Sequence, residues 1–296
     1  MLMKKYSFLV TGVTSFIGSN VALYLCNQGH NVMGIARSKD TNSLKNLVDK
    51  TNFNLIQADL AKNLKINNDV DVIFHAAAQA PNRGATASDY LMNHVIATQK
   101  IIDYALKHKV NKLVFCSTIS VFGEVKERIV SENTSIINPP LHGLCKYFGE
   151  LLLQEKSQEL SSLAIRLPGV VGPGAHNIWL AKVLNKALNN EDIHITNPHS
   201  PFNNVVWIED LSKFVESLAE KNWKEYNHIT LGSEEPITIQ EVANTLVSAC
   251  RSGSKIIGEE KSSYISFTIS IDKAKQMFGY NSRTTKEVIN LYSKNY

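Results

Sequence analysis

Cysteine is scarce in this chain, with only four residues in 296. Cys26, Cys116, Cys145 and Cys250 have neither the paired spacing of metal ligands nor the framework of a disulfide-stabilised secreted domain. We therefore expect reduced, buried or half-buried thiols and a cytoplasmic location, where thiols stay reduced. The nine histidines also lack ligand spacing, so we expect no metal site.

Long apolar runs and an excess of one charge are absent as well. The apolar run 6–10, which follows Lys4 and Lys5, is too short for a signal-peptide core or a membrane-spanning helix. The 31 basic and 27 acidic residues give a formal charge of +4, and the basic residues are scattered along the chain. These features argue against a membrane partner and against a nucleic-acid partner.

The composition that remains is typical of a globular protein, with 44% hydrophobic and 20% charged residues. In the first half, short apolar runs alternate with longer amphipathic stretches. The strand-like runs are 6–10, 31–36, 54–58, 70–76, 112–117 and 163–167. The clearest helical stretches are 18–28, 90–107 and 144–160. This alternation predicts the α/β class, a doubly wound parallel sheet of the Rossmann type over residues 1–167.

The second half is less regular. Helices are expected at 179–189, 209–221 and 238–250, and the segment 197–204 is rich in turn residues. No long linker or internal repeat separates the halves. We expect residues 168–296 to form mainly a smaller, irregular substrate-binding lobe that is interleaved with the first domain.

Residues 11–18, Thr-Gly-Val-Thr-Ser-Phe-Ile-Gly, lie between the first expected strand and the first expected helix. In that position backbone N–H groups and the helix dipole can hold a pyrophosphate. Gly12 and Gly18 suit a tight turn and close helix packing, whereas Ser15 stands where a third glycine is usual. The alternative is an ordinary strand–turn–helix. We expect dinucleotide binding through Gly12, Thr14, Ser15, Phe16, Ile17 and Gly18.

The end of the second expected strand bears on the choice of cofactor. An NAD-specific site usually carries an acidic residue there, which grips the ribose 2′-hydroxyl. Here the strand ends in Ala36, Arg37 and Ser38. Ala36 leaves room for a 2′-phosphate, and the Arg37 guanidinium matches phosphate geometry. We therefore expect NADP, bound with the help of Arg37 and Ser38, and NAD is the alternative cofactor. Alternatively, Arg37 is an ordinary solvated surface residue without a role in binding.

Several further motifs follow in order along the chain. They are Asp59-Leu60, His75-Ala76-Ala77-Ala78, Asn93, and the segments 117–123, 166–174, 205–211 and 272–280, the last of which resembles a C-terminal helix. Together with the glycine turn they resemble the extended short-chain dehydrogenase/reductase family, the NAD-dependent epimerase/dehydratase group that modifies nucleotide sugars. The resemblance implies an enzyme. It also implies cofactor contacts through Asp59, Leu60, Ala76, Ala77, Ala78, Asn93 and Leu167.

The resemblance assigns catalysis to a tyrosine and a lysine four residues later, on one face of a helix. The matching segment 140–146 retains Lys146 but carries His142 at the tyrosine position, and Thr118 stands where the family has a catalytic hydroxyl. We therefore expect Thr118, His142 and Lys146 to be catalytic, with Lys146 also holding the nicotinamide ribose. The Lys146 ammonium disfavours protonation of His142. Alternatively, His142 only fills the space of a lost tyrosine.

The resemblance further implies a nucleotide-sugar substrate. The residues expected to contact it are Gln79, Thr118, His142, His176, Asn177, Asn203 and Asn204. Because Arg37 favours NADP, we expect reduction of a keto group on a nucleotide-activated deoxy sugar. The alternatives are an NAD-dependent epimerase or dehydratase, a catalytically impaired NADP-binding protein, and a reductase of non-sugar carbonyl compounds. A homodimer through helices 90–107 and 144–160 is also implied.

Overall fold

A computed structural model describes residues 4–38, 42–62, 66, 68–79, 84–175, 178–261 and 265–295. The described residues form two compact units. The first unit comprises residues within 1–124, 136–166 and 211–229, and the second comprises residues within 125–135, 167–210 and 230–296. The chain therefore crosses several times between the units. The cofactor and substrate roles expected for 1–167 and 168–296 stay predictions.

A seven-stranded sheet organises the first unit, in the order β12-β7-β5-β4-β1-β2-β3. Its strands are β1 Ser7–Thr11, β2 Asn31–Ala36, β3 Phe53–Gln57, β4 Val72–His75, β5 Lys112–Thr118, β7 Ser162–Leu167 and β12 Tyr226–Thr230. The β1–β2, β2–β3, β1–β4 and β4–β5 pairs are parallel. The order runs from β1 to β2 on one side and to β4 on the other, so the topological switch point lies at β1. The predicted doubly wound α/β fold is confirmed.

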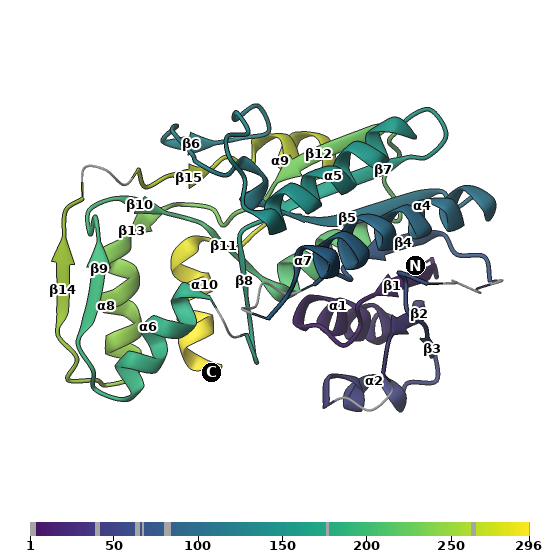
Figure 1. Cartoon of the computed structure of the whole chain (residues 1–296). Helices are drawn as coiled ribbons and strands as arrows, with labels where there is room; N and C mark the ends of the chain where they lie inside the picture. Colours follow the sequence, from purple (N-terminus) through teal and green to yellow (C-terminus); the bar gives the residue numbers. More distant parts are fainter. Residues whose placement is uncertain are drawn as a thin grey trace. The chain divides into compact units, whose positions relative to one another are not determined.

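Both faces of this sheet are buried, as strand alternation requires. Leu9, Ile73 and Phe115 pack in one cluster with Ile101 of α4 (Ala97–Lys107) and Leu153 of α5 (Leu141–Glu155). Figure 1 shows α4 and α5 next to each other, and they are in contact. The alternate residues on the same strands are also buried, among them Phe8, Val10 and Phe74. The other side holds α1 (Phe16–Asn27), which contacts β1 and β2, and α7 (Ile208–Ser217), whose Glu216 accepts from Tyr24 of α1.

The helix expected at 90–107 is longer and less uniform than the sequence predicts. It begins with α3 (Ala87–Tyr90), passes through a π-helical segment, η2 (Leu91–Ile96), and continues as α4. The remaining short helices of this unit are η1 (Asn42–Leu44), α2 (Lys45–Val48) and η3 (Ile119–Phe122). The helix expected at 144–160 is α5, which begins three residues earlier, after the extended residue Pro140, and ends five residues earlier, at Glu155.

Short strand pairs and helices make up the second unit. Its strands are β6 Ile129–Val130, β8 Gly169–Val171, β9 Ile193–Thr196, β10 Pro201–Phe202, β11 Val205–Trp207, β13 Ile237–Thr238, β14 Ile256–Glu259 and β15 Thr268–Ile269. They pair as β6–β15, β8–β11, β9–β14 and β10–β13. Its helices are α6 Trp179–Leu188, α8 Ile239–Ala249, α9 Asp272–Phe278 and α10 Thr285–Lys294. The helices expected at 179–189, 238–250 and 272–280 are thus present within two residues at each end.

No helix among the described residues is both long enough and apolar enough to cross a membrane.

Candidate active site and cofactor cleft

The glycine turn after β1 has the close approaches that only glycine permits. Gly12 has a φ of +73°, and a Cβ added to it would lie 2.8 Å from Cα of Ala77. A Cβ on Gly18 would lie 2.2 Å from the carbonyl oxygen of Gly12. Both glycines are therefore required for α1 to begin directly against the turn.

Ser15, the departure from the usual glycine pattern, has a structural explanation. It is the N-cap of α1, and its Oγ accepts a hydrogen bond from the N–H of Gly18 at 3.2 Å. The same Oγ donates to the carbonyl oxygen of Gly12 at 2.7 Å. Phe16 and Ile17 open the helix, and the N–H groups of a first helical turn lack acceptors within the helix. Ser15 thus closes the turn and leaves the helix end able to bind an anion.

A cleft beside this turn collects most of the residues predicted to bind the cofactor. The predicted residues that line it are Gly12, Thr14, Ser15, Arg37, Asp59, Leu60, Ala77, Ala78 and Asn93. Ile35, Ala36, Ala58 and Ala97, which were not predicted as contacts, line it too. Of the other predicted residues, Phe16, Ile17 and Gly18 form the first turn of α1 and Ala76 follows β4. Ser38 is exposed after β2, and Leu167 ends β7.

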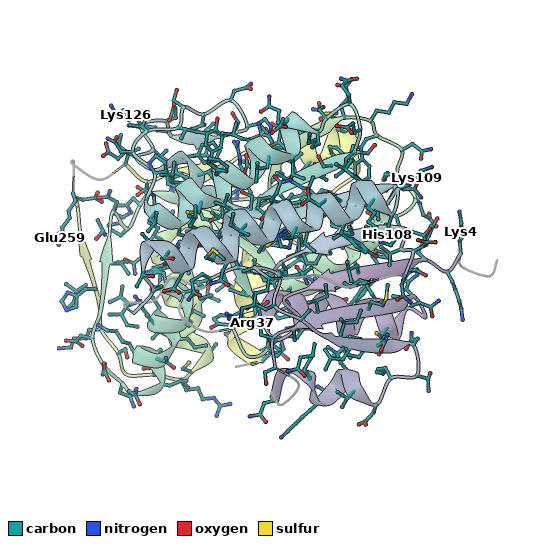
Figure 2. The ribbon with its side chains drawn as sticks, turned by 45° about the vertical axis from the view of Figure 1, so that its right-hand side comes forward. Lys4, Arg37, His108, Lys109, Lys126 and Glu259 are labelled. Carbon is teal, nitrogen blue, oxygen red and sulfur yellow. The ribbon has the colours of Figure 1, made fainter. Side chains whose placement is uncertain are left out.

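Arg37 lies at the rim of the cleft and is exposed. Figure 2 shows it at the opposite end of the sheet from Lys4, His108 and Lys109, which places it at the carboxyl ends of the strands. Its neighbour Ala36 contributes only a small side chain to the cleft wall. A glycine turn without room for Cβ atoms and a helix N-terminus beside it together fit a dinucleotide.

A buried hydrogen-bond chain fixes the wall of the cleft. Thr11 Oγ1 accepts from the N–H of Ala77 at 3.0 Å and lies 2.7 Å from His75 Nδ1. His75 Nε2 lies 3.1 Å from Oγ1 of Thr98, on α4. His75 is completely buried, and burial followed by the nearby Lys146 charge holds its pKa well below the usual range. A neutral imidazole therefore ties β1, β4 and α4 together beneath the cofactor cleft.

The predicted catalytic pair lies on the first two turns of α5. Lys146 is buried, and its Nζ donates to the carbonyl oxygen of Cys116 at 2.5 Å and lies 4.6 Å from the centre of the Phe115 ring. Burial lowers the pKa of Lys146. Beside His142, a Cβ on Gly143 would lie 2.1 Å from the carbonyl oxygen of Ser120. This glycine therefore lets the start of α5 pack directly on η3.

His142 is half-buried and lies against two other aromatic rings. The ring of His94 is 5.1 Å from that of His142 and almost perpendicular to it, and the ring of Tyr90 is 6.3 Å away. Burial, followed by the Lys146 charge, lowers the pKa of His142 to about 4. Its Nδ1 is buried and finds no hydrogen-bond partner among the described residues. His142 is consequently a neutral imidazole at physiological pH.

Thr118 is the extended residue before η3, the short helix that packs on α5. Its Oγ1 accepts from the N–H of Ser120 at 3.2 Å and donates to Ser120 Oγ at 3.3 Å. The structure therefore brings the elements that carry Thr118 and His142 together. The Thr118 hydroxyl meanwhile caps the helix, a local role that a substrate oxygen would share or displace.

One turn beyond Lys146, Glu150 anchors a buried network that the sequence reasoning missed. Its carboxylate accepts from Ser117 Oγ at 2.5 Å, from Arg166 at 2.7 Å and from the Tyr226 hydroxyl at 3.2 Å. Glu150 and Arg166 are both almost completely buried. The network joins α5 to β5, β7 and β12. The spacing His142, Lys146, Glu150 on one helix face is the signal from which it could have been predicted.

Comparison with known proteins decides the family. The profile of the NAD dependent epimerase/dehydratase family matches residues 8–232. The chain belongs to this family. The resemblance derived from the sequence is thereby confirmed, and with it the assignment to an enzyme family of the extended short-chain dehydrogenase/reductase type.

Relatives of the chain include an uncharacterized UDP-glucose epimerase of Bacillus subtilis, 28% identical over 94% of this chain and 93% of that protein. A dTDP-D-glucose 4,6-dehydratase of Dictyostelium discoideum is 24% identical over 81% of this chain and 61% of its own. Among solved structures, UDP-glucuronic acid 4-epimerase from Bacillus cereus in complex with NAD is 22% identical, with a TM-score of 0.81 and 98% coverage of both chains. At that identity the structural likeness shows the fold.

The residues of this family member that are predicted to bind substrate in the second unit differ in their surroundings. Asn203 is buried, and its side-chain amide bonds to Ser233 and to both main-chain groups of Ile269. These bonds give Asn203 a structural role. Asn204, in contrast, lines a cavity of about 500 Å³, and its buried Oδ1 has no hydrogen-bond partner among the described residues. His176 and Asn177 lie outside the described residues.

The same cavity contains an aromatic pair. The rings of Trp179 and Phe202 lie 5.5 Å apart, and Lys261 and His194 also line the cavity. The cavity thus combines flat apolar surfaces, a cation and an unpartnered acceptor. Across the described residues, no group of three or more His, Cys, Asp or Glu side chains is placed to hold a metal ion.

Proposed function

We propose that the chain is an NADP-dependent reductase that acts on a keto group of a nucleotide-linked deoxy sugar. The observation that carries this proposal is Arg37, which lies at the rim of the cofactor cleft beside the small Ala36. An acidic residue at this place would favour NAD. An enzyme that consumes its cofactor in each turnover draws on NADPH, so the preference for NADP favours a net reduction.

The proposed cofactor contacts follow the cleft. The Gly12 turn and the first N–H groups of α1 bind the diphosphate, and Arg37 binds the 2′-phosphate. Asp59 and Leu60 contact the adenosine part, and Asn93 contacts the cofactor farther along the cleft. We assign Lys146 to the nicotinamide ribose, as the family resemblance implies. When bound, NADPH supplies a hydride to the carbonyl carbon.

His142 polarises the carbonyl group that is reduced. Its ring is neutral at physiological pH because burial lowers its pKa to about 4. A neutral imidazole is a poor proton donor, but its N–H can donate a hydrogen bond to the carbonyl oxygen and stabilise the negative charge that develops there. The hydroxyl of Thr118, next to α5, provides a second hydrogen-bond donor. The alkoxide then takes its proton from water, and the product is the alcohol.

The nucleotide part of the substrate binds in the second unit. The supporting observation is the cavity with Trp179, Phe202, Lys261 and Asn204. Aromatic rings stack on a nucleobase, a lysine pairs with phosphate, and the Asn204 acceptor can receive an N–H from the base. The names of the relatives, which include UDP-glucose and dTDP-D-glucose enzymes, support this substrate class.

Steady-state kinetics test the proposal. Keto sugars linked to UDP, GDP, CDP or dTDP are offered with NADPH or NADH, and consumption of the cofactor is followed at its absorbance maximum. We expect turnover with NADPH and one of the four nucleotides. His142→Phe, which fills the same space without a donor, should lower kcat by about 100-fold, the loss typical of one oxyanion donor. His142→Tyr should retain activity.

Two results would overturn this reading. An unchanged kcat in His142→Phe would remove the catalytic role of His142. Absence of both turnover and thermal stabilisation with all four nucleotides would indicate a non-sugar carbonyl substrate, or a protein that binds the cofactor without catalysis.

A second candidate is an epimerase or dehydratase that recycles tightly bound NAD. The observation in its favour is that several relatives carry these activities in their names. Such an enzyme holds its cofactor during purification. The absorbance spectrum of the denatured and deproteinised preparation distinguishes this candidate from the reductase. A reductase releases no stoichiometric NAD, which is the result that we expect.

We also propose a homodimer and a cytoplasmic location. Leu141, Leu144, Phe148 and Leu151 follow one another on α5 at spacings of three and four residues, and each is at least 42% exposed. Such a stripe is typical of a helix that packs against a partner helix. The cytoplasmic location is supported by four cysteines that are all free.

A further inference from the structure

The π-helical segment η2 places two consecutive residues, Asn93 and His94, toward two different sites. Asn93 lines the cofactor cleft, and its Nδ2 donates to the carbonyl oxygen of Asp89 at 2.9 Å. His94 is 2% exposed and lies against His142. π-helical turns occur mostly as single-turn bulges within α-helices, and they are frequent at functional sites. The irregularity of this helix therefore points to a function of His94 as well as of Asn93.

The main chain of Gln79 holds the ring of His94. His94 Nε2 lies 3.2 Å from the N–H nitrogen of Gln79 and 3.1 Å from its carbonyl oxygen. This ring nitrogen thus has a donor and an acceptor within reach, so His94 keeps a partner in either neutral tautomer. Its other side stacks on Tyr90, with ring centres 5.5 Å apart and planes 25° apart. The ring of His94 is thus held by Gln79 and by Tyr90, in addition to its contact with His142.

For His142, no hydrogen bond to its Nδ1 is found among the described residues, although this atom is buried. The rings of His94 and Tyr90 pack against the His142 ring. The ring torsion of a histidine is broad and roughly two-fold, so packing must decide which edge faces inward. Nδ1 is the buried nitrogen here, and we therefore assign the contact with substrate to Nε2.

We propose that His94 is a positioning residue for His142. The ring of His94, anchored by Gln79, packs edge-to-face on the ring of His142 and keeps its Nδ1 edge in the protein and its Nε2 edge available to substrate. This inference rests on the proposed function, since it presupposes that His142 acts on the substrate. It adds a residue that the sequence motifs do not include. Both rings are kept neutral by burial and by Lys146, which allows them to pack without charge repulsion.

Two variants of His94 test the proposal. His94→Ala removes the ring and should lower kcat by about 10-fold to 100-fold, as expected for a misplaced catalytic group, with the Kd for NADPH unchanged. His94→Phe keeps an aromatic ring at the same place and should recover most of the lost kcat. His108→Phe, beyond the other end of the same helix, is the matched control and should match the wild type.

A spectroscopic measurement keeps the proposal testable if His94→Ala does not fold. In the wild type, with ring nitrogens labelled with ¹⁵N, His142 should show a single neutral tautomer between pH 5.5 and 8 and magnetisation transfer to the His94 ring. His94→Phe should preserve one set of His142 signals.

The results that contradict the proposal are distinct from those that contradict the proposed function. If His142→Phe abolishes turnover while His94→Ala retains the wild-type kcat, the positioning role is wrong and the proposed function stands. If His94→Phe is as impaired as His94→Ala, ring contact is not the cause and the proposal also fails. If His142→Phe is fully active, the catalytic role of His142 is wrong and the positioning role loses its purpose, whereas the ¹⁵N measurement still reports whether His94 orients His142.

Discussion

At the scale of single residues, Arg37 makes the sharpest prediction about the cofactor. A hydrogen bond to a charged group contributes about 1.5–3 kcal/mol, so Arg37→Ala should raise the Kd for NADPH by roughly 10-fold to 100-fold. The Kd for NADH should hardly change, because NADH has no 2′-phosphate. Isothermal titration measures both. Arg128→Ala, an exposed arginine of the second unit, is the matched control. A wild-type protein that binds NADH more tightly than NADPH would contradict the assignment.

Individual residues were predictable from the sequence where a local motif dictates them. Gly12 and Gly18 follow from the turn between strand and helix, whereas the role of Lys146 was implied by the family resemblance and stays a prediction. Ser15 could be recognised as a departure, but its capping bonds to Gly12 and Gly18 become visible only in three dimensions. His94 was missed for a different reason. A regular helical period would not predict its direction, because η2 interrupts that period.

At the scale of elements, the alternation of strands and helices predicted six strands of the sheet and missed β12. The β12 segment, Tyr-Asn-His-Ile-Thr, contains only two apolar residues that favour strands, one at its start and one near its end. It shows no clear alternation of apolar and polar residues. It lies at the edge of the sheet beside β7. The two strands are far apart in the sequence, unlike the strands of a hairpin. Pairing with β7 is a tertiary interaction, and local patterns do not report it.

The stripe on α5 predicts how elements of two copies meet. If the stripe of Leu141, Leu144, Phe148 and Leu151 packs against the same helix of a second copy, the interface has two-fold symmetry. A charge introduced into the stripe is then buried in both copies. Phe148→Glu should therefore convert a dimer into a monomer, by light scattering coupled to size-exclusion chromatography. Val48→Glu changes an equally exposed apolar residue on α2 and should leave the dimer intact. A wild type that is monomeric at tens of micromolar would refute the interface.

At the scale of the whole molecule, the unusual feature is the set of neutral histidines around one buried lysine. His75, His94 and His142 all have a lowered pKa, caused first by burial and then by Lys146. Lys146 is itself buried, which lowers its pKa, and the nearby Glu150 carboxylate opposes this effect. The folded state therefore disfavours protonation of these imidazoles, which links the stability of the protein to pH.

The direction of this linkage is fixed by the two protonation states. An unfolded histidine binds a proton near pH 6.5, whereas His142 and His94 in the folded chain do so only near pH 4 and 3. Below pH 6.5 the unfolded state thus binds more protons, and stability falls as the pH falls. Between pH 7.5 and 5, before carboxylates titrate, the melting temperature should decrease by several degrees. The double variant His94→Phe/His142→Phe should show a shallower decrease over this interval, and His199→Phe, which changes an exposed histidine, should keep the wild-type slope. Equal slopes in all three proteins would mean that the two imidazoles bind protons over the same pH range in the folded and the unfolded state. That result would contradict the lowered pKa of His142 and His94.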